Sequence, residues 1–201
     1  MRQQAKDLIF RTYLAGKRLL GGSGERIAVL CYHRVSDELR DHVTVGVRQF
    51  DQQMAFVKEN YRVVALRALI ETGGAGERGP LAAITFDDGY LDNYQNAFPI
   101  LQKHGVSATF FVSTDHITEG KPFAHDLEKL GRGLPNMSWE QIREMHRAGM
   151  DFGSHTANHV DLGRIGEAQA RDELTRSNAA MQAELGLADN LFAFPFGRRG
   201  T

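Results

Sequence analysis

Residues 81–90 read LAAITFDDGY, and the fold class can be worked out from this stretch and its surroundings. The run Leu81–Phe86 carries no charge and does not alternate between polar and apolar residues. That pattern is typical of a parallel strand covered on both faces. Two carboxylates, Asp87 and Asp88, follow at once. Neighbouring carboxylates raise each other's pKa, and a divalent cation relieves the repulsion, but a plain Asp-Gly turn at Gly89 explains these residues equally well.

The segments on both sides of this stretch alternate between apolar, β-branched runs and helical patterns. Predicted strands are Arg26–Tyr32, Tyr61–Leu66, Leu81–Phe86, Ser107–Val112, Met150–Gly153 and Leu191–Phe194. Predicted helices are Val47–Asn60, Leu91–Lys103, Trp139–Arg147 and Glu167–Leu185, the third with a capping box at Ser138 and Gln141. This alternation predicts an α/β fold with a parallel sheet. Residues 119–136 are expected to form an irregular excursion beside the site.

Polar residues follow the predicted strands at their carboxyl ends, where parallel folds build their sites. They are His33, Asp87, Asp88, His155 and the segment Pro195-Phe196-Gly197. His155 and His159 lie one helical turn apart and can converge on one ion. Two imidazoles and one carboxylate form a three-ligand site with a position left for water. The alternative is a helix N-terminus with two exposed histidines, but the nearby aspartate pair favours metal binding.

Other residues with reactive side chains stand in sequence contexts that do not indicate a functional site. Cys31 stands in an apolar run and is expected in the core. A lone histidine after a strand, such as His33, is usually structural, and Phe192–Gly197 fits a hydrophobic strand ending in a proline turn. No role is predicted for His42, His104, His116, His125 and His146.

Composition excludes several classes of protein. The 24 basic and 25 acidic residues nearly cancel, so a nucleic-acid-binding surface is not predicted. One cysteine excludes an intramolecular disulfide and a multi-cysteine zinc site. No apolar run reaches about 18 residues, the length that predicts a membrane span. The pattern of residues 1–22 predicts a basic amphipathic helix, either packed on the domain or lying on an anionic membrane surface. The charged residues within this segment interrupt the apolar core that a signal peptide needs. We therefore expect a cytoplasmic protein, or one at the membrane face.

Two motifs resemble those of a known family. Thr85–Gly89 reads TFDDG and His155–His159 reads HTANH. They are similar to the first two motifs of the polysaccharide deacetylases (NodB-like, carbohydrate esterase family 4), from about Ile27 to the end of the chain. The resemblance implies an irregular (β/α) barrel over residues 23–201, which we expect to be incomplete at its C-terminal end. It also implies hydrolysis of N-acetyl groups on an amino-sugar polysaccharide or oligosaccharide, with release of acetate.

The resemblance also implies roles for individual residues. Asp87 would be the general base, and Asp88, His155 and His159 would hold a divalent metal, zinc first, with cobalt, nickel or iron as alternatives. Thr156 would brace the loop. After Pro195, the backbone N–H of Phe196 would stabilise the oxyanion. Tyr90, Trp139, Phe194 and Phe196 could stack on a sugar ring or belong to the core.

The third motif of the family departs from its usual pattern, because Ala193 stands where many members have an arginine. The usual late motif, Leu-x-x-His, instead occurs early, as Leu30-Cys31-Tyr32-His33. This resembles the circularly permuted deacetylases of poly-N-acetylglucosamine, and it implies that Leu30 lines the acetyl pocket and His33 is the general acid.

Two alternative functions stay open: an amide hydrolase for a small non-sugar substrate, and a catalytically weak sugar-binding module. The sequence does not indicate an oligomeric state.

Overall fold

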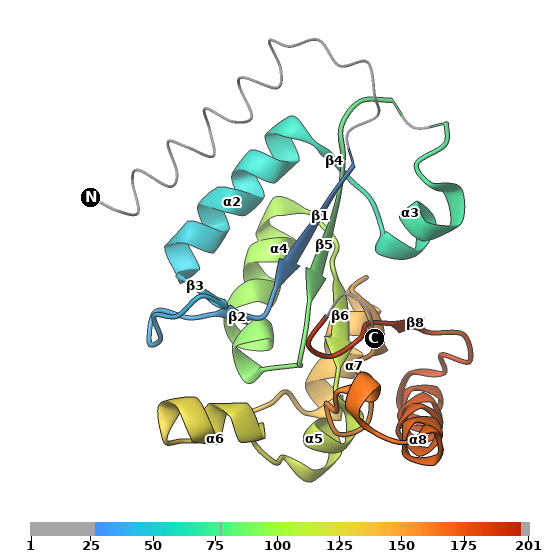
Figure 1. The fold of residues 1–201 in the computed structure, drawn as a ribbon. Helices are drawn as coiled ribbons and strands as arrows, with labels where there is room; N and C mark the ends of the chain where they lie inside the picture. The colour runs from blue at the N-terminus through green and yellow to red at the C-terminus, as the bar shows by residue number, and fades with distance from the viewer. Residues whose placement is uncertain (1–26, 77, 198–201) are drawn as a thin grey trace.

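The computed structural model describes residues 27–76 and 78–197, and a curled parallel sheet forms its centre (Figure 1). Within those residues the main sheet has six strands: β1 (Ile27–Tyr32), β4 (Arg62–Val63), β5 (Leu81–Phe86), β6 (Thr109–Val112), β7 (Asp151–Ser154) and β8 (Leu191–Phe192). The strand order is β1-β5-β6-β7-β8, with β4 paired to the first residues of β5. All strand pairs of this sheet are parallel, so the predicted α/β fold with a parallel sheet is confirmed, and the curled sheet is consistent with the expected irregular (β/α) barrel.

Most helices pack around this sheet and cover the hydrophobic core. They are α2 (Val47–Asn60), α3 (Leu66–Thr72), the π-helical turn Asn93–Ala97 that continues into α4 (Phe98–His104), α5 (Thr114–Glu119), α7 (Trp139–Arg147) and α8 (Glu167–Leu185). The remaining α-helix of the described part, α6 (Ala124–Leu130), lies away from the sheet and contributes no residue to the core clusters (Figure 1). Phe86, Phe110 and Phe152 stack from β5 to β7, with ring centroids 4.7 and 5.5 Å apart. Buried residues of α2, α4, α7 and α8 belong to the same cluster, which therefore joins helices and sheet into one core.

Several predicted elements have the expected bounds, and others do not. Helices α2, α7 and α8 begin and end where predicted, and the capping box of Ser138 and Gln141 is present. The predicted strand 61–66 is shorter, because Leu66 already begins α3. Residues 119–136 are not wholly irregular, since they contain α6. A small parallel pair, β2 (Arg34–Val35) and β3 (Thr44–Val45), was not predicted.

Two expectations concern the N-terminal segment and membranes. The helix predicted for residues 1–22 lies outside the described residues. Among the helices of the described part, none combines the length and apolar character needed to cross a bilayer.

Candidate active site

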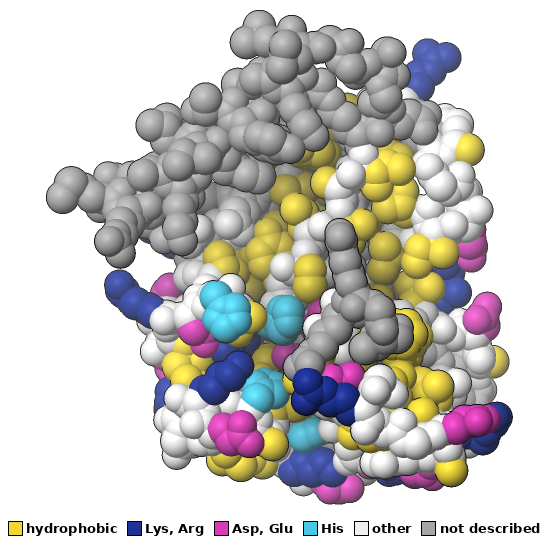
Figure 2. All heavy atoms as spheres, viewed as in Figure 1, with side chains coloured by type: hydrophobic (Ala, Val, Ile, Leu, Met, Phe, Trp, Pro, Cys, Tyr) yellow, Lys and Arg dark blue, Asp and Glu magenta, His cyan; other side chains and the backbone are white. Residues whose placement is uncertain are grey.

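The polar residues after the strands meet at one edge of the sheet, as predicted. In the register of β1 and β5, Tyr32 pairs with Phe86, so His33 and Asp87 follow neighbouring strand ends. The backbone N–H of Asp87 donates to the Tyr32 carbonyl at 2.9 Å. His155 follows β7, and its N–H donates to the Val112 carbonyl of β6. Figure 2 shows histidine side chains gathered on one face, together with acidic and basic groups.

Asp88, His155 and His159 form a compact group of three candidate metal ligands. One ligand atom from each lies within 4.8 Å of the other two. Asp88 Oδ1 is 3.1 Å from His159 Nε2 and 3.6 Å from His155 Nε2. Despite these distances, Asp88 Oδ1 is buried and has no hydrogen-bond partner of acceptable geometry among the residues that the structure describes. A buried carboxylate oxygen needs a partner, and a divalent cation between the three side chains would supply it.

The orientation of His155 also suits metal binding. Its Nδ1 lies 2.9 Å from the carbonyl oxygen of Ala193. A carbonyl oxygen can only accept, so Nδ1 carries the proton and the lone pair of Nε2 faces Asp88. Such a second bond is the usual way in which proteins orient a histidine ligand. Burial lowers the pKa of His155, which favours the neutral ring that a metal requires.

Electrostatics keep Asp88 ionised in spite of its burial. Burial by itself raises the pKa of this carboxyl group, but the contacts with the His159 and His155 side chains outweigh that effect. The net effect lowers the pKa of Asp88 to about 2. The group is therefore a carboxylate, the form that binds cations.

Backbone strain concentrates at this edge of the sheet. In the described part of the chain, the non-glycine residues with positive φ are Asp88 (77°), Thr156 (63°), His159 (54°) and Phe196 (67°). Such conformations cost on the order of 1–3 kcal/mol each and persist only where the surroundings enforce them. Here Thr156 Oγ1 accepts from the Val160 N–H at 3.3 Å, and the Asp88 carbonyl accepts from the Ser113 N–H at 3.3 Å.

The loop that carries both histidines is held by α8. Glu173, only 3% exposed, accepts from the backbone N–H of Asn158 at 2.8 Å and from its side-chain amide at 2.9 Å. Arg176, one turn along α8, approaches the same carboxylate at 3.3 Å. The sequence indicated no role for Glu173, because its contact to the loop spans 15 residues and no motif marks it.

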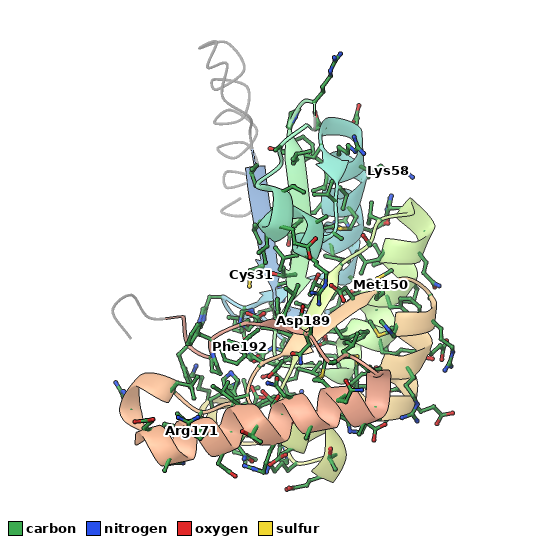
Figure 3. The ribbon with its side chains drawn as sticks, turned by 90° about the vertical axis from the view of Figure 1, so that its right-hand side faces the viewer. Cys31, Lys58, Met150, Arg171, Asp189 and Phe192 are labelled. Carbon is green, nitrogen blue, oxygen red and sulfur yellow. The ribbon has the colours of Figure 1, made fainter. Side chains whose placement is uncertain are left out.

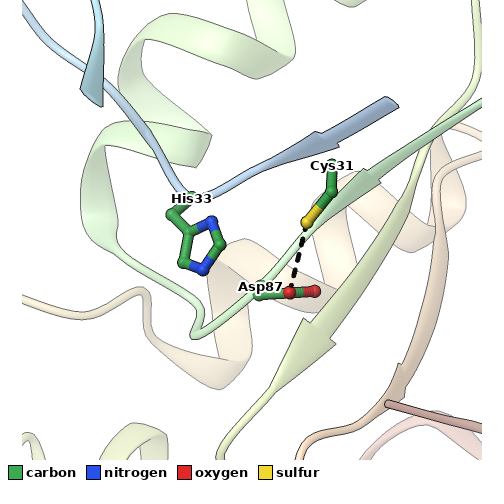
Figure 4. A group of neighbouring side chains, drawn as sticks. All are labelled: Cys31, His33 and Asp87. Carbon is green, nitrogen blue, oxygen red and sulfur yellow. Dashed lines mark hydrogen bonds between the residues drawn. The ribbon is translucent and has the colours of Figure 1, made fainter. Parts of the chain in front are cut away.

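The structure separates the two adjacent aspartates. Asp87 belongs to a different cluster from Asp88 and lies with Cys31 and His33, at the ends of β5 and β1 (Figure 4). The Cys31 thiol donates to Asp87 Oδ2 at 3.3 Å. Cys31 was expected in the core, and this was wrong: it is exposed, because side chains of β1 alternate and Cys31 lies on the face of that strand opposite the core (Figure 3). Although the residue is exposed, partial desolvation of its sulfur by the neighbouring residues and the charge of Asp87 raise the pKa of the Cys31 thiol to about 12.

Four further predicted residues lie in different surroundings. Phe196 is 51% exposed, and its ring centroid is 4.9 Å from that of His159, while Pro195 is buried. Leu30 is half-buried and packs against the main core. Tyr90 is only 1% exposed, so its ring is a core group and cannot stack on a ligand at the surface.

A cavity of about 500 Å³ opens beside His159. It is lined by His116, Lys121, Pro122, Phe123, Ala124, His125, Leu127, Glu128, Asn158, His159 and Phe196. His125, for which no role was predicted, lies 2.9 Å from the Tyr90 hydroxyl, which itself donates to Asp126 at 2.9 Å. The His125 ring centroid is 5.4 Å from that of His159. The only sequence signal for His125 was its place in the segment expected beside the site.

Comparisons with known proteins agree on one family. The family profile described as polysaccharide deacetylase matches residues 75–201. The structure of IcaB from Ammonifex degensii superimposes with a TM-score of 0.74 at 30% identity, covering 89% of this chain and 77% of that one. The deacetylase PplD of Streptococcus pyogenes, solved in complex with acetate, gives a TM-score of 0.73 at 29% identity, covering 86% and 75%.

A curated relative is also named as a deacetylase. The chain is 25% identical over 173 residues to poly-beta-1,6-N-acetyl-D-glucosamine N-deacetylase of Staphylococcus aureus, with 81% of this chain and 56% of the relative covered. The chain spans 56–57% of the length of the first curated relatives that it matches. The matched profile, the fold and the two motifs at the strand ends together place the chain in the polysaccharide deacetylase family.

Proposed function

We propose that the protein is a zinc-dependent hydrolase that removes N-acetyl groups from an amino-sugar polysaccharide or oligosaccharide and releases acetate. The observation that carries this proposal is the buried Oδ1 of Asp88, which lies near two histidine Nε2 atoms and has no hydrogen-bond partner within the described part of the chain. Two imidazoles and a carboxylate are the ligand set of many hydrolytic zinc sites. The named relatives, an N-deacetylase of poly-N-acetylglucosamine and a deacetylase in complex with acetate, supply the substrate class.

Asp88, His155 and His159 would hold the cation. When bound, it polarises the acetamide carbonyl and makes water a better nucleophile near neutral pH. Asp87, which lies next to Asp88 but outside that cluster, takes the proton of the attacking water. The backbone N–H of Phe196 donates to the tetrahedral oxyanion. His33 gives a proton to the departing amine nitrogen, which is otherwise a poor leaving group.

The surface beside these residues suits a sugar ring. Phe194 and Phe196 are 60% and 51% exposed, which is unusual for phenylalanine in the absence of a ligand or partner. The cavity next to Phe196 also presents polar groups, among them Lys121 and His125. Apolar faces mixed with a few polar groups are typical of sites for small molecules and sugars.

The test is acetate release from N-acetylglucosamine oligomers, with chelator-treated protein before and after zinc is added back. We expect Asp87→Asn to bind zinc as the wild type does but to lose turnover by about 10²–10⁴-fold, the usual contribution of a general base. His33→Ala should also lose turnover. Asp151→Asn is the matched control, because it makes the same substitution at the start of β7, the opposite end from His155. Equal turnover in all four proteins would refute the assigned roles.

Two alternatives have distinct outcomes in the same experiment. Zinc binding without acetate release from any oligomer would favour a sugar-binding module. Activity on small acyclic or cyclic amides, but not on acetylated sugars, would favour the non-sugar amide hydrolase, which the same group of residues could also catalyse.

A further inference from the structure

A second group of candidate metal ligands lies beside the first. Cys31 Sγ, a ring nitrogen of His33 and a carboxylate oxygen of Asp87 all lie within 4.8 Å of one another. Figure 4 shows the thiol and the ring facing the carboxylate from the end of β1 and the turn after it. The proposed hydrolytic reaction uses His33 and Asp87 as acid and base but gives the thiol no part.

Strand geometry brings these three groups together. Cys31 and His33 are two positions apart, so their side chains leave the chain on the same side of β1. Asp87 follows Phe86, the partner of Tyr32 in the register of β1 with β5. Cys31 Sγ lies 3.3 Å from Asp87 Oδ2. Tetrahedral zinc with Zn–S near 2.3 Å and Zn–O near 2.1 Å separates its ligand atoms by roughly 3.6 Å, so only small side-chain rotations are needed.

The surroundings leave the group open to an ion from solvent. Cys31 is exposed, and His33 and Asp87 are half-buried. Three protein ligands also leave a fourth position for water. The chemistry differs from that of the Asp88 cluster, because a thiolate is a soft ligand that favours zinc, cadmium or copper(I) over calcium or magnesium.

We propose that Cys31, His33 and Asp87 form a second cation site for thiophilic metal ions, and that zinc in excess, or cadmium, stops hydrolysis by occupying it. An ion held there engages the carboxylate that would accept the proton of water and the imidazole that would protonate the amine. The inhibition rests on the proposed function, whereas the binding does not.

Binding at this site must displace a proton. The Cys31 thiol donates its hydrogen to Asp87, so the sulfur carries a proton when no ion is bound. When the ion binds, the S–H bond breaks, the S–metal bond forms and the proton passes to solvent. The Asp88 cluster contains no thiol, so no S–H bond has to break when an ion binds there. We therefore expect the Asp88 cluster to be filled first and the second site only at higher metal concentration.

Cadmium titration of the chelator-treated full chain tests the site directly. Cys31 is the only cysteine, so the ultraviolet sulfur-to-cadmium charge-transfer band reports this residue alone. We expect two cadmium ions and the band in the wild type, but one ion and no band in Cys31→Ser. Serine is the matched substitution, because its hydroxyl can still donate to Asp87 but is a poor ligand for soft ions. His155→Ala should keep the band, and His33→Ala should weaken cadmium binding at the thiol by about tenfold or more.

Inhibition is measured against each variant's own rate at optimal zinc. Cys31→Ser should need at least about tenfold more zinc or cadmium for half-inhibition than the wild type, because the loss of even an outer partner of a metal ligand typically costs about 10–100-fold in affinity. An unchanged midpoint in Cys31→Ser, or unchanged cadmium affinity in His33→Ala, would overturn the second site. A charge-transfer band that persists in a protein inactive under all conditions would instead overturn the proposed function and leave the second site standing.

Discussion

Glu173 offers a strong test of how the fold positions the site, because it contacts neither the proposed metal nor the substrate. Its side chain is 4% exposed, and both carboxylate oxygens accept hydrogen bonds from Asn158, which lies between the two candidate histidine ligands. A hydrogen bond to a charged group contributes about 1.5–3 kcal/mol to stability, and part of this contribution offsets the free-energy cost of burying the carboxylate. Glu173→Ala also leaves the partly buried N–H of Asn158 without this acceptor. We expect it to lower the free energy of unfolding by about 2–4 kcal/mol.

The same substitution should weaken metal binding, because the loop would no longer be held in the strained conformation of His159. Loss of an outer partner of a metal ligand typically costs about 10–100-fold in affinity. Urea unfolding of chelated protein measures the first effect, and competition with a chromophoric chelator measures the zinc affinity. The matched control is Asp172→Ala on the same turn of α8, whose side chain is 61% exposed and contacts Arg176. It should change the unfolding free energy by less than about 0.5 kcal/mol.

Two results would refute this reasoning. If Glu173→Ala unfolds at the same urea concentration as the control, the buried carboxylate does not stabilise the loop. If it loses stability but binds zinc as tightly as the wild type, the loop keeps its geometry without α8. Glu173→Gln, which keeps one acceptor oxygen, should fall between the wild type and alanine in both measurements.

Three further substitutions test other parts of the structure. Burial raises the pKa of Asp92 to about 6, so the ionised form destabilises the fold, and the free energy of unfolding falls as pH rises from about 4 through 6. Asp92→Asn should therefore increase the free energy of unfolding by up to about 3 kcal/mol at pH 7 and leave it unchanged near pH 4. Urea unfolding at both pH values measures the difference. Phe110→Ala removes the middle ring of the core stack and should cost about 3–5 kcal/mol in the same assay. Gly89 has φ +98°, and an added Cβ would lie 3.1 Å from side-chain atoms of Ile117 and Val112, so Gly89→Ala should lower the thermal midpoint and the zinc affinity together.

Local patterns in the sequence were sufficient to predict the bounds of the longest strands and helices. Leu81–Phe86 has the predicted bounds and is buried throughout, because an unbroken apolar run can be satisfied only between two covering layers. Helices α7 and α8 also have the predicted bounds, since the capping box and the glycine stop act over a single turn. Short elements such as α3 and α6, each seven residues long, were missed, because so few residues carry little periodic signal.

The proximity of Asp88, His155 and His159 could also be predicted from sequence. In a parallel sheet all carboxyl ends lie at one edge, so residues that follow different strands must be neighbours there. Their separation from Asp87 follows from the change of side-chain direction between consecutive residues. What the order of residues could not specify is the strained backbone that aims them, which depends on contacts from β6 and α8.

Sequence alone therefore determined the parallel α/β architecture and the edge at which reactive side chains collect, because both depend on strand and helix patterns of short range. Only the tertiary structure decided that Cys31 faces Asp87 at the surface, that Glu173 holds the histidine loop and that His125 lines the cavity beside His159. Each of these depends on which side of an element faces a segment distant in the chain. That choice is made by the packing of the whole core, and no local pattern of residues encodes it.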